Sequence, residues 1–144
     1  MYPQTVVVGP VTSVVSMCGV EDFLIYTLDD EETIQNALKM VTETAVEAIK
    51  MLAKQGAKMI LIADPSLSLV TPPFFEKCVL PLYKKIFTCL KELGMYSRLH
   101  VCGNINAILP LLVGCGTNVL DADHPVVLEN AKQITKALED YAKR

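Results

Sequence analysis

The sequence predicts an α/β fold in which parallel strands alternate with helices. Short apolar runs bounded by turn residues recur four times along the 144 residues. Each run is followed by a longer segment whose apolar residues step by threes and fours, as on one face of a helix. No linker, repeat or low-complexity tract interrupts the alternation, so residues 1–144 are expected to form a single domain. Strict alternation implies a parallel sheet with right-handed crossovers.

The strands are expected over residues 5–8, 58–63, 97–102 and 117–121. The second run, KMILIA, is apolar on both faces, which is typical of a parallel strand covered by helices. Two architectures fit four such βα units. One is an open doubly wound sheet, and the other is part of a (β/α)8 TIM barrel, which in complete form needs about 200 residues or more.

Helices are expected over residues 13–27, 30–55, 72–93 and 104–113, and from near Pro125 onward. The second has the clearest pattern, because its apolar residues lie on one face; Asp29 is expected to cap it. Pro81 is expected to kink or split the third helix. Asp123 and His124 are expected to cap the last one.

The composition argues against several classes of function. The formal net charge is −3 and no Lys/Arg cluster stands out, so nucleic-acid binding by charge is not expected. No apolar run reaches the roughly 18 residues that cross a bilayer, and MYPQTVVVGP does not have the pattern of a secretory signal. The five cysteines are odd in number and form no disulfide framework, which favours a reducing cytoplasm.

The strand over residues 97–102 carries the most informative pair. His100 and Cys102 are two residues apart and therefore share one face, while Leu99 and Val101 share the other. The apolar pair suits the helix layer. Imidazole and thiolate are a natural pair of zinc ligands, although zinc needs at least three protein ligands. The alternative is a half-buried histidine beside a packed cysteine, without metal.

Other polar residues lie at the carboxyl ends of the strands, where active sites of both architectures are built. Asp64 is a candidate catalytic base, an oxygen ligand or a hydrogen-bond partner of His100; alternatively, it makes the turn out of its strand. Asp121 has the same ambiguity. The candidates for substrate contact at this edge are Ser68, Asn104 and Asp121.

Four segments occur in a specific order and spacing. They are GPVT at 9–12, QGAKMILIADPSLSLVTPPFFEKCVLPLYKKI at 55–86, LHVCGNINAILPLL at 99–112, and Asp121 followed by ENAK at 129–132. Together they resemble the uroporphyrinogen decarboxylase superfamily and, within it, the cobamide-dependent methyltransferases. The resemblance implies a (β/α)8 barrel in which His100 and Cys102 descend from zinc ligands.

The methyltransferase branch implies transfer of a methyl group from a methylated corrinoid, carried on a separate corrinoid protein, to a small thiol such as coenzyme M. Zinc would make the thiolate available at neutral pH. The alternative is a decarboxylase acting on a tetrapyrrole, which uses an Asp and Arg residues and no metal. That branch has an N-terminal Arg-rich segment that this chain lacks, and it has no H-x-C-G, so the methyltransferase branch is favoured.

The resemblance also implies what this chain does not contain. Family members are more than twice as long, so the domain is expected to be truncated at both ends, and no residue matches the family's third zinc ligand, a late cysteine. The zinc ligand set is therefore expected to be incomplete. Open edges at strands 5–8 and 117–121 predict a homo-oligomer or a partner chain that supplies missing strands. A non-catalytic fragment that keeps the fold is a further alternative.

Overall fold

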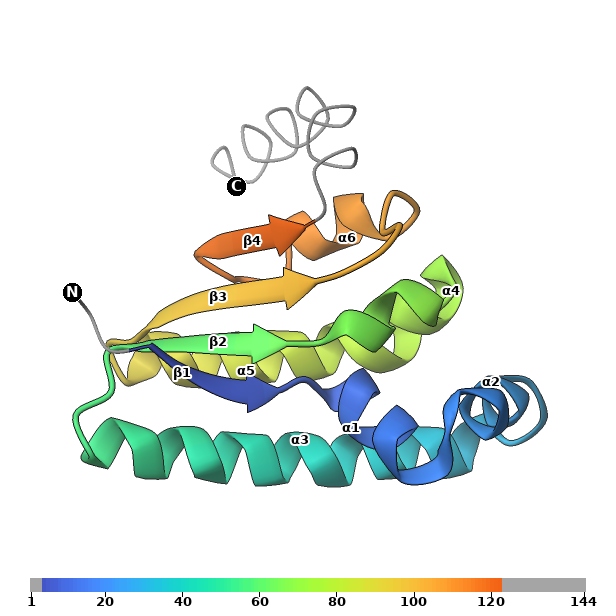
Figure 1. The fold of residues 1–144 in the computed structure, drawn as a ribbon, viewed down its shortest axis with the longest axis horizontal. Helices are drawn as coiled ribbons and strands as arrows, with labels where there is room; N and C mark the ends of the chain where they lie inside the picture. Colours follow the sequence, from blue (N-terminus) through green and yellow to red (C-terminus); the bar gives the residue numbers. More distant parts are fainter. Residues whose placement is uncertain (1–3, 123–144) are drawn as a thin grey trace.

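Four parallel strands form one sheet in the order β1-β2-β3-β4, so neighbours in the chain are neighbours in the sheet (Figure 1). The computed structural model describes residues 4–122. Its strands are β1 (Gln4–Val8), β2 (Met59–Ala63), β3 (Tyr96–Val101) and β4 (Val119–Ala122). Each predicted strand is therefore present, with its ends shifted by no more than two residues.

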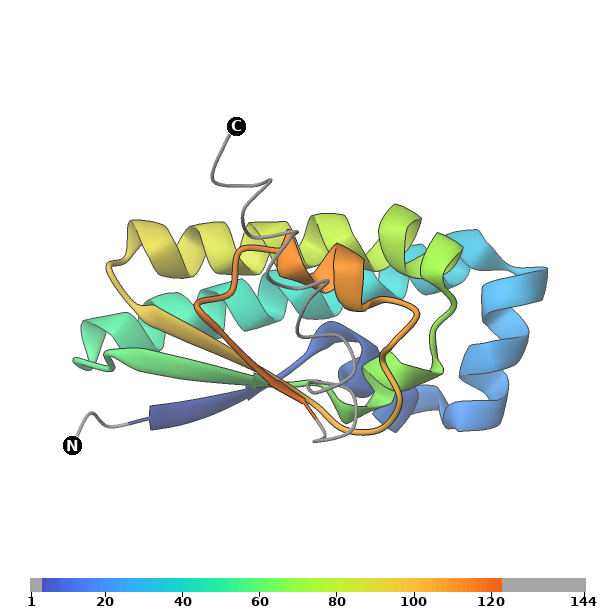
Figure 2. The same cartoon turned by 90° about the horizontal axis from the view of Figure 1, so that it is seen from above.

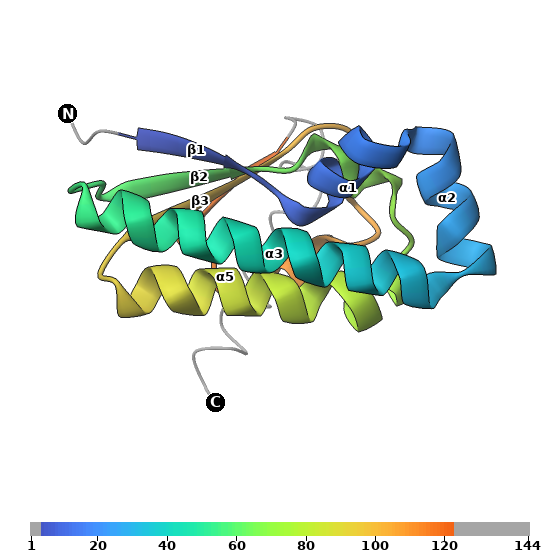
Figure 3. The ribbon, with the colours of Figure 1, turned by 90° about the horizontal axis from the view of Figure 1, so that it is seen from below.

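The helices are α1 (Pro10–Cys18), α2 (Val20–Asp29), α3 (Glu31–Lys54), α4 (Pro72–Phe74), α5 (Leu80–Glu92) and α6 (Leu109–Val113). Two short segments complete the set: the 3₁₀ turn η1 (Pro65–Leu69) and the π-helical turn η2 (Phe75–Val79). The long helices α3 and α5 pack against the same face of the sheet (Figures 2 and 3). A doubly wound sheet has helices on both faces, whereas helices on one face of sequentially ordered parallel strands form a barrel wall. The fold is a partial (β/α)8 barrel, as predicted.

The helix predicted over residues 13–27 is wrong as a single element. Gly19 divides it into α1 and α2, which meet at 107°. The backbone at Gly19 has φ +88°, a conformation that residues other than glycine adopt only at a cost in free energy. Within residues 4–122 no single helix is long and apolar enough to cross a membrane, although this bent pair passes the test of length and composition.

Two other boundaries differ from the prediction. Asp30, not Asp29, caps α3, because Asp29 is the last residue of α2; an Asp30 oxygen accepts from the Thr33 N–H at 3.2 Å. The helix expected from residue 104 begins only at Leu109, with Pro110 in its first turn, where a missing N–H costs nothing. Pro81 has the same place in α5, and η2 splits the helix before it, as predicted. The expected last helix, with Asp123 and His124, lies outside the described residues.

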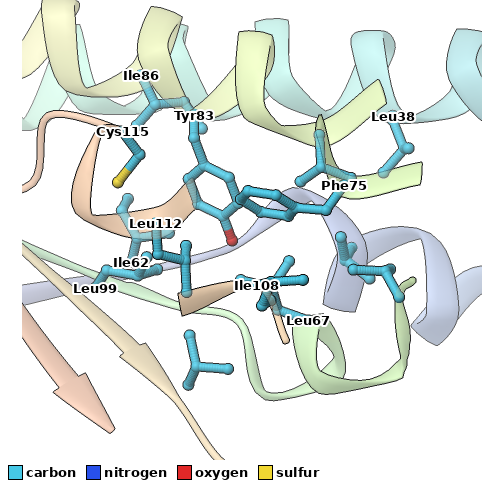
Figure 4. Close-up of a cluster of buried hydrophobic side chains, with 14 of the residues drawn as sticks. Leu38, Ile62, Leu67, Phe75, Tyr83, Ile86, Leu99, Ile108, Leu112 and Cys115 are labelled. Atoms are coloured by element: carbon cyan, nitrogen blue, oxygen red, sulfur yellow. The ribbon is translucent and has the colours of Figure 1, made fainter. Parts of the chain in front are cut away.

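The core lies between the sheet and the layer of α3, α5 and α6 (Figure 4). Tyr83 of α5 projects into its middle, stacked on Phe87 with ring centroids 5.7 Å apart. The other face of the sheet is open in the described part of the chain. Its apolar side chains are half exposed; they include Val6 (55%), Val8 (49%), Tyr96 (57%) and Val119 (45%). In a complete barrel this face lines the interior.

Candidate functional site

His100 and Cys102 lie together at the carboxyl end of β3. The His100 Nε2 atom is 3.1 Å from the Cys102 sulfur. Leu99 and Val101 are fully buried beneath the helices, while Cys102 is exposed and the His100 side chain is 34% exposed. The prediction that the polar pair shares the face opposite the apolar pair is confirmed, because alternate residues of a strand point to opposite sides.

Gly103 allows the chain to turn directly after this pair. Its φ is +81°, and a Cβ atom built there would lie 3.0 Å from the Ser68 hydroxyl oxygen. This close approach brings Ser68 of η1 against Gly103, the residue that follows Cys102. Asn104 is exposed in the same turn, where its side-chain oxygen accepts from the Asn106 N–H at 3.0 Å.

Asp121 lies directly opposite His100 on the neighbouring strand β4. One carboxylate oxygen of Asp121 is 3.0 Å from His100 Nδ1 and accepts from Arg98 Nη2 at 2.6 Å. Partial burial raises the pKa of Asp121, but the hydrogen bonds from Arg98 and His100 outweigh it and hold that pKa below its ordinary value. A line of contacts therefore runs from Arg98 through Asp121 and His100 to Cys102.

Asp64 follows β2, but its carboxylate turns away from the His100–Cys102 pair and toward the start of α1. It is fully buried and accepts four hydrogen bonds: from the Val11 N–H, from the N–H and hydroxyl of Thr12, and from the Tyr83 hydroxyl. Because the N-cap residue Gly9 has no side chain, Asp64 caps α1 from a distant part of the sequence. Burial raises the pKa of Asp64, against the hydrogen bonds from Thr12 and Tyr83, which lower it.

Gly9 leaves the space that the Asp64 carboxylate fills. A Cβ atom at Gly9 would come within 2.3 Å of an Asp64 oxygen. The GPVT segment and the Asp-Pro turn therefore meet as two halves of one contact, although 52 or more residues separate them in sequence. Asp64 and His100 are linked through the backbone, where the Asp64 N–H donates to the His100 carbonyl oxygen at 2.9 Å.

Two residues of this region were not predicted from the sequence. Tyr83 lay within an ordinary amphipathic helix pattern, and no local signal distinguished it. Arg98 had a signal: it precedes His100 by two residues and so shares its face, and a charge in the middle of a parallel strand is unusual. The Arg98 side chain is 38% exposed, while its Nε atom is buried with no hydrogen-bond partner in the structure described.

The pair His100 and Cys102 fits zinc in the chemistry of its donors, an imidazole nitrogen and a thiol sulfur. Within the described residues, no group of three or more His, Cys, Asp or Glu side chains is arranged to hold a metal ion. Asp121 binds the opposite nitrogen of the imidazole, which is the usual arrangement of a carboxylate that orients a histidine ligand. The described part of the chain thus presents two donors and one orienting group.

A pocket of about 680 Å³ opens at the other end of the sheet. It lies between α5 and the turn before β4, and its lining includes Lys84, Phe87, Tyr96 and Asn118. Chemistry in parallel α/β folds is located at the carboxyl ends of strands, whereas this pocket is at their amino ends. We therefore place the candidate site at His100 and Cys102 and not in this pocket.

Comparison with known proteins relates the chain to one family. The family model for uroporphyrinogen decarboxylase (URO-D) matches residues 5–140. Methylcobamide:CoM methyltransferase MtbA of Methanosarcina acetivorans is 34% identical over 103 residues, covering 70% of this chain and 30% of that protein. Methylcobamide:CoM methyltransferase MtaA of Methanosarcina barkeri is 28% identical over 137 residues, covering 94% of this chain and 39% of that protein.

A decarboxylase and a solved structure also match. Uroporphyrinogen decarboxylase of Carboxydothermus hydrogenoformans is 30% identical over 102 residues, covering 71% of this chain and 29% of that protein. The structure of a methyltransferase from Methanosarcina mazei superimposes with a TM-score of 0.75 at 26% identity, covering 83% of this chain and 35% of that one. The chain thus spans 29–39% of the length of these four proteins.

Proposed function

The chain belongs to the uroporphyrinogen decarboxylase family, and from this premise we propose that it is a member of the methyltransferase type. Such a member passes a methyl group from a methylated corrinoid, carried on a separate corrinoid protein, to a small thiol such as coenzyme M. The observation that carries the proposal is the His100–Cys102 pair, whose Nε2 and Sγ atoms are 3.1 Å apart at the carboxyl end of β3. The names of the MtbA and MtaA relatives support it.

In this proposal His100 and Cys102 hold a zinc ion, which when bound lowers the pKa of a thiol and makes thiolate available at neutral pH. His100 offers its Nε2 atom and Cys102 its sulfur. We propose Ser68 and Asn104 as the residues that contact the thiol substrate. The compartment we propose is the reducing cytoplasm, because an exposed thiol such as Cys102 has to stay unoxidised to serve as a ligand.

For Asp64 the contacts favour a supporting role over that of a general base. Its carboxylate is fully buried and accepts from four donors of the chain itself. A base must reach the proton that it removes. We propose that Asp64 serves catalysis by fixing the start of α1 beside the ends of β2 and β3.

In our proposal the remaining parts of the site lie outside the described residues 4–122. Zinc needs at least three protein ligands, and His100 and Cys102 are two. The sheet has open edges at β1 and β4 within residues 4–122. We propose that a second copy or a partner chain supplies further strands, and that a third ligand completes the zinc site from outside residues 4–122.

The activity can be tested with methylcobalamin as methyl donor. The zinc-supplemented chain, with coenzyme M or another small thiol, should convert methylcobalamin to its demethylated form, followed by its absorbance spectrum. H100A and C102A should abolish this conversion. C89S is the matched control, since Cys89 is a partly exposed cysteine on α5, away from the site. Conversion that persists in H100A and C102A would contradict the proposal.

Two other functions have specific support. The name of the family model and the Carboxydothermus relative favour a decarboxylase of tetrapyrrole biosynthesis. It would release CO₂ from uroporphyrinogen without zinc, and H100A would leave that release unchanged. The open edges of β1 and β4 within residues 4–122 favour a non-catalytic subunit that completes a barrel with another chain. It would bind zinc or its partner without demethylating methylcobalamin.

A further inference from the structure

We propose that Arg98 and Asp121 are positioning residues that hold the His100 ring in one orientation and one tautomer, with the unprotonated Nε2 turned to Cys102. This proposal rests on the proposed function only for the identity of the ion, zinc, that His100 and Cys102 bind. The orientation and tautomer of His100 can be measured in the metal-free protein.

His100 donates the hydrogen bond that it shares with Asp121. An ionised carboxylate has acceptors only, so the 3.0 Å contact at Nδ1 requires the proton to be on that nitrogen. A neutral imidazole carries one N–H, so its Nε2 then has a free lone pair. That lone pair faces the Cys102 sulfur at 3.1 Å, in the place where a metal ligand is needed.

Arg98 anchors the Asp121 carboxylate. Register pairing sets Asp121 opposite His100 and sets Val119 opposite Arg98. Arg98 and His100 therefore lie on the same face of β3, and both reach the same Asp121 oxygen. With its oxygen held by Arg98 at 2.6 Å, the Asp121 carboxylate presents a fixed acceptor to the imidazole.

Packing alone does not account for the position of the Arg98 side chain. Its Nε atom is buried without a partner in the described part of the chain, which is an unfavourable state for a polar group. The ion pair with Asp121 is the contact that compensates for it. A role confined to tying β3 to β4 is already filled by Asn118, whose side-chain oxygen accepts from the Ser97 N–H and hydroxyl, each at 2.9 Å.

The tautomer of His100 is measurable directly, because the chain has two histidines. The full chain is labelled with ¹⁵N-histidine, and long-range ¹H–¹⁵N correlations are recorded without metal at about pH 8, where free histidine is neutral. H124Q identifies the signals of His100. Wild-type His100 is expected in the Nδ1–H form. D121A should move it toward the Nε2–H form that free histidine prefers, R98M should move it part of the way, and R98K should restore it.

N118A is the matched control, because it removes a second tie between β3 and β4 without touching His100. It should lower stability and leave the tautomer unchanged. An Nε2–H form in the wild type, or an unchanged tautomer in D121A, would overturn the inference. If D121A does not fold, R98M decides, since it keeps Asp121: an Nδ1–H population equal to that of the wild type would overturn the inference.

Zinc affinity gives a second measure that separates this inference from the proposed function. Loss of a carboxylate that orients a histidine ligand lowers metal affinity by about 10–100-fold, which is expected for D121A. If the wild-type chain binds no zinc, the proposed function fails while the tautomer result still judges Arg98 and Asp121. If wild type and D121A bind zinc equally and share one tautomer, the positioning role fails and the proposed function stands.

Discussion

The Tyr83 hydroxyl donates to an Asp64 oxygen at 2.6 Å, and both side chains are fully buried. The other donors to Asp64 come from Val11 and Thr12 at the start of α1. One carboxylate therefore joins the ends of β1 and β2 to α5. We call this contact the Asp64 clasp. It lies at the carboxyl ends of the strands, as His100 does, but on the helix-covered side of the sheet.

The Asp64 clasp should contribute measurably to stability. D64N leaves the Val11 N–H facing an amide N–H group, and an unsatisfied buried donor costs about 1–3 kcal/mol. Y83F removes one hydrogen bond and should lower the free energy of unfolding by about 1 kcal/mol. Urea unfolding measures both. Y26F, at an exposed tyrosine of α2, is the control and should be neutral; equal effects of Y83F and Y26F would refute the clasp.

The pH dependence of stability should have opposite signs at Asp64 and Asp121. The pKa of Asp64 is raised in the folded state by burial, so its contribution to stability falls as pH rises from about 4 through the folded pKa. The pKa of Asp121 is lowered because the hydrogen bonds from Arg98 and His100 outweigh burial, so its contribution is present above about pH 4 and is lost as pH falls.

Unfolding of D64N and D121N between pH 3.5 and 7 measures these contributions. The difference in unfolding free energy between wild type and D64N should shrink as pH rises. The difference between wild type and D121N should grow. The same slope for both variants would contradict the environments that we assign to the two carboxylates.

Gly103 should be required both for its backbone angle and for the space beside Ser68. G103A has to accept φ +81° and a 3.0 Å approach to the Ser68 hydroxyl. G56A is a matched control, because Gly56 has φ +87° with open space around its Cβ position. Both variants should lose about 1–2 kcal/mol from the left-handed backbone, and G103A should lose more. A larger loss in G56A, measured by thermal unfolding, would refute the crowding at Ser68.

The open face of the sheet should drive association of the isolated chain. Val6 and Val8 are about half exposed on the edge strand β1, and unpaired strand edges pair readily with other chains. Sedimentation velocity at micromolar concentration should show oligomers, and V6K with V8K should shift them toward monomer. M40K, at an exposed methionine of α3, should not. A monodisperse wild-type monomer would count against this prediction.

The sequence contains enough information to place the strands and the His100–Cys102 pair, because alternation along a strand is a local rule. It also contained the signal for Arg98, which lies two residues before His100 and therefore shares its face. The Asp64 clasp could not be predicted in this way. It depends on contacts between residues more than 50 apart, with Val11 and Thr12 at the start of α1, and with a tyrosine of α5 that has no local mark.

Errors at helix boundaries have a common cause. Periodicity of apolar residues shows that a helix is present but not where the backbone turns. Gly19 permits a left-handed residue in the middle of an apolar run and so breaks a predicted helix. Pro110 allows a helix to start late, after a turn in which the Asn104 side chain binds the backbone of Asn106.

Zinc binding by the full chain decides whether His100 and Cys102 are metal ligands. Zinc is titrated into reduced, metal-free protein and followed by calorimetry, for wild type, H100A, C102A and the control C89S. We expect a zinc site in the wild type and in C89S, with an affinity that falls sharply in H100A and in C102A. Equal zinc binding in H100A, C102A and the wild type would contradict the assignment of His100 and Cys102 as ligands.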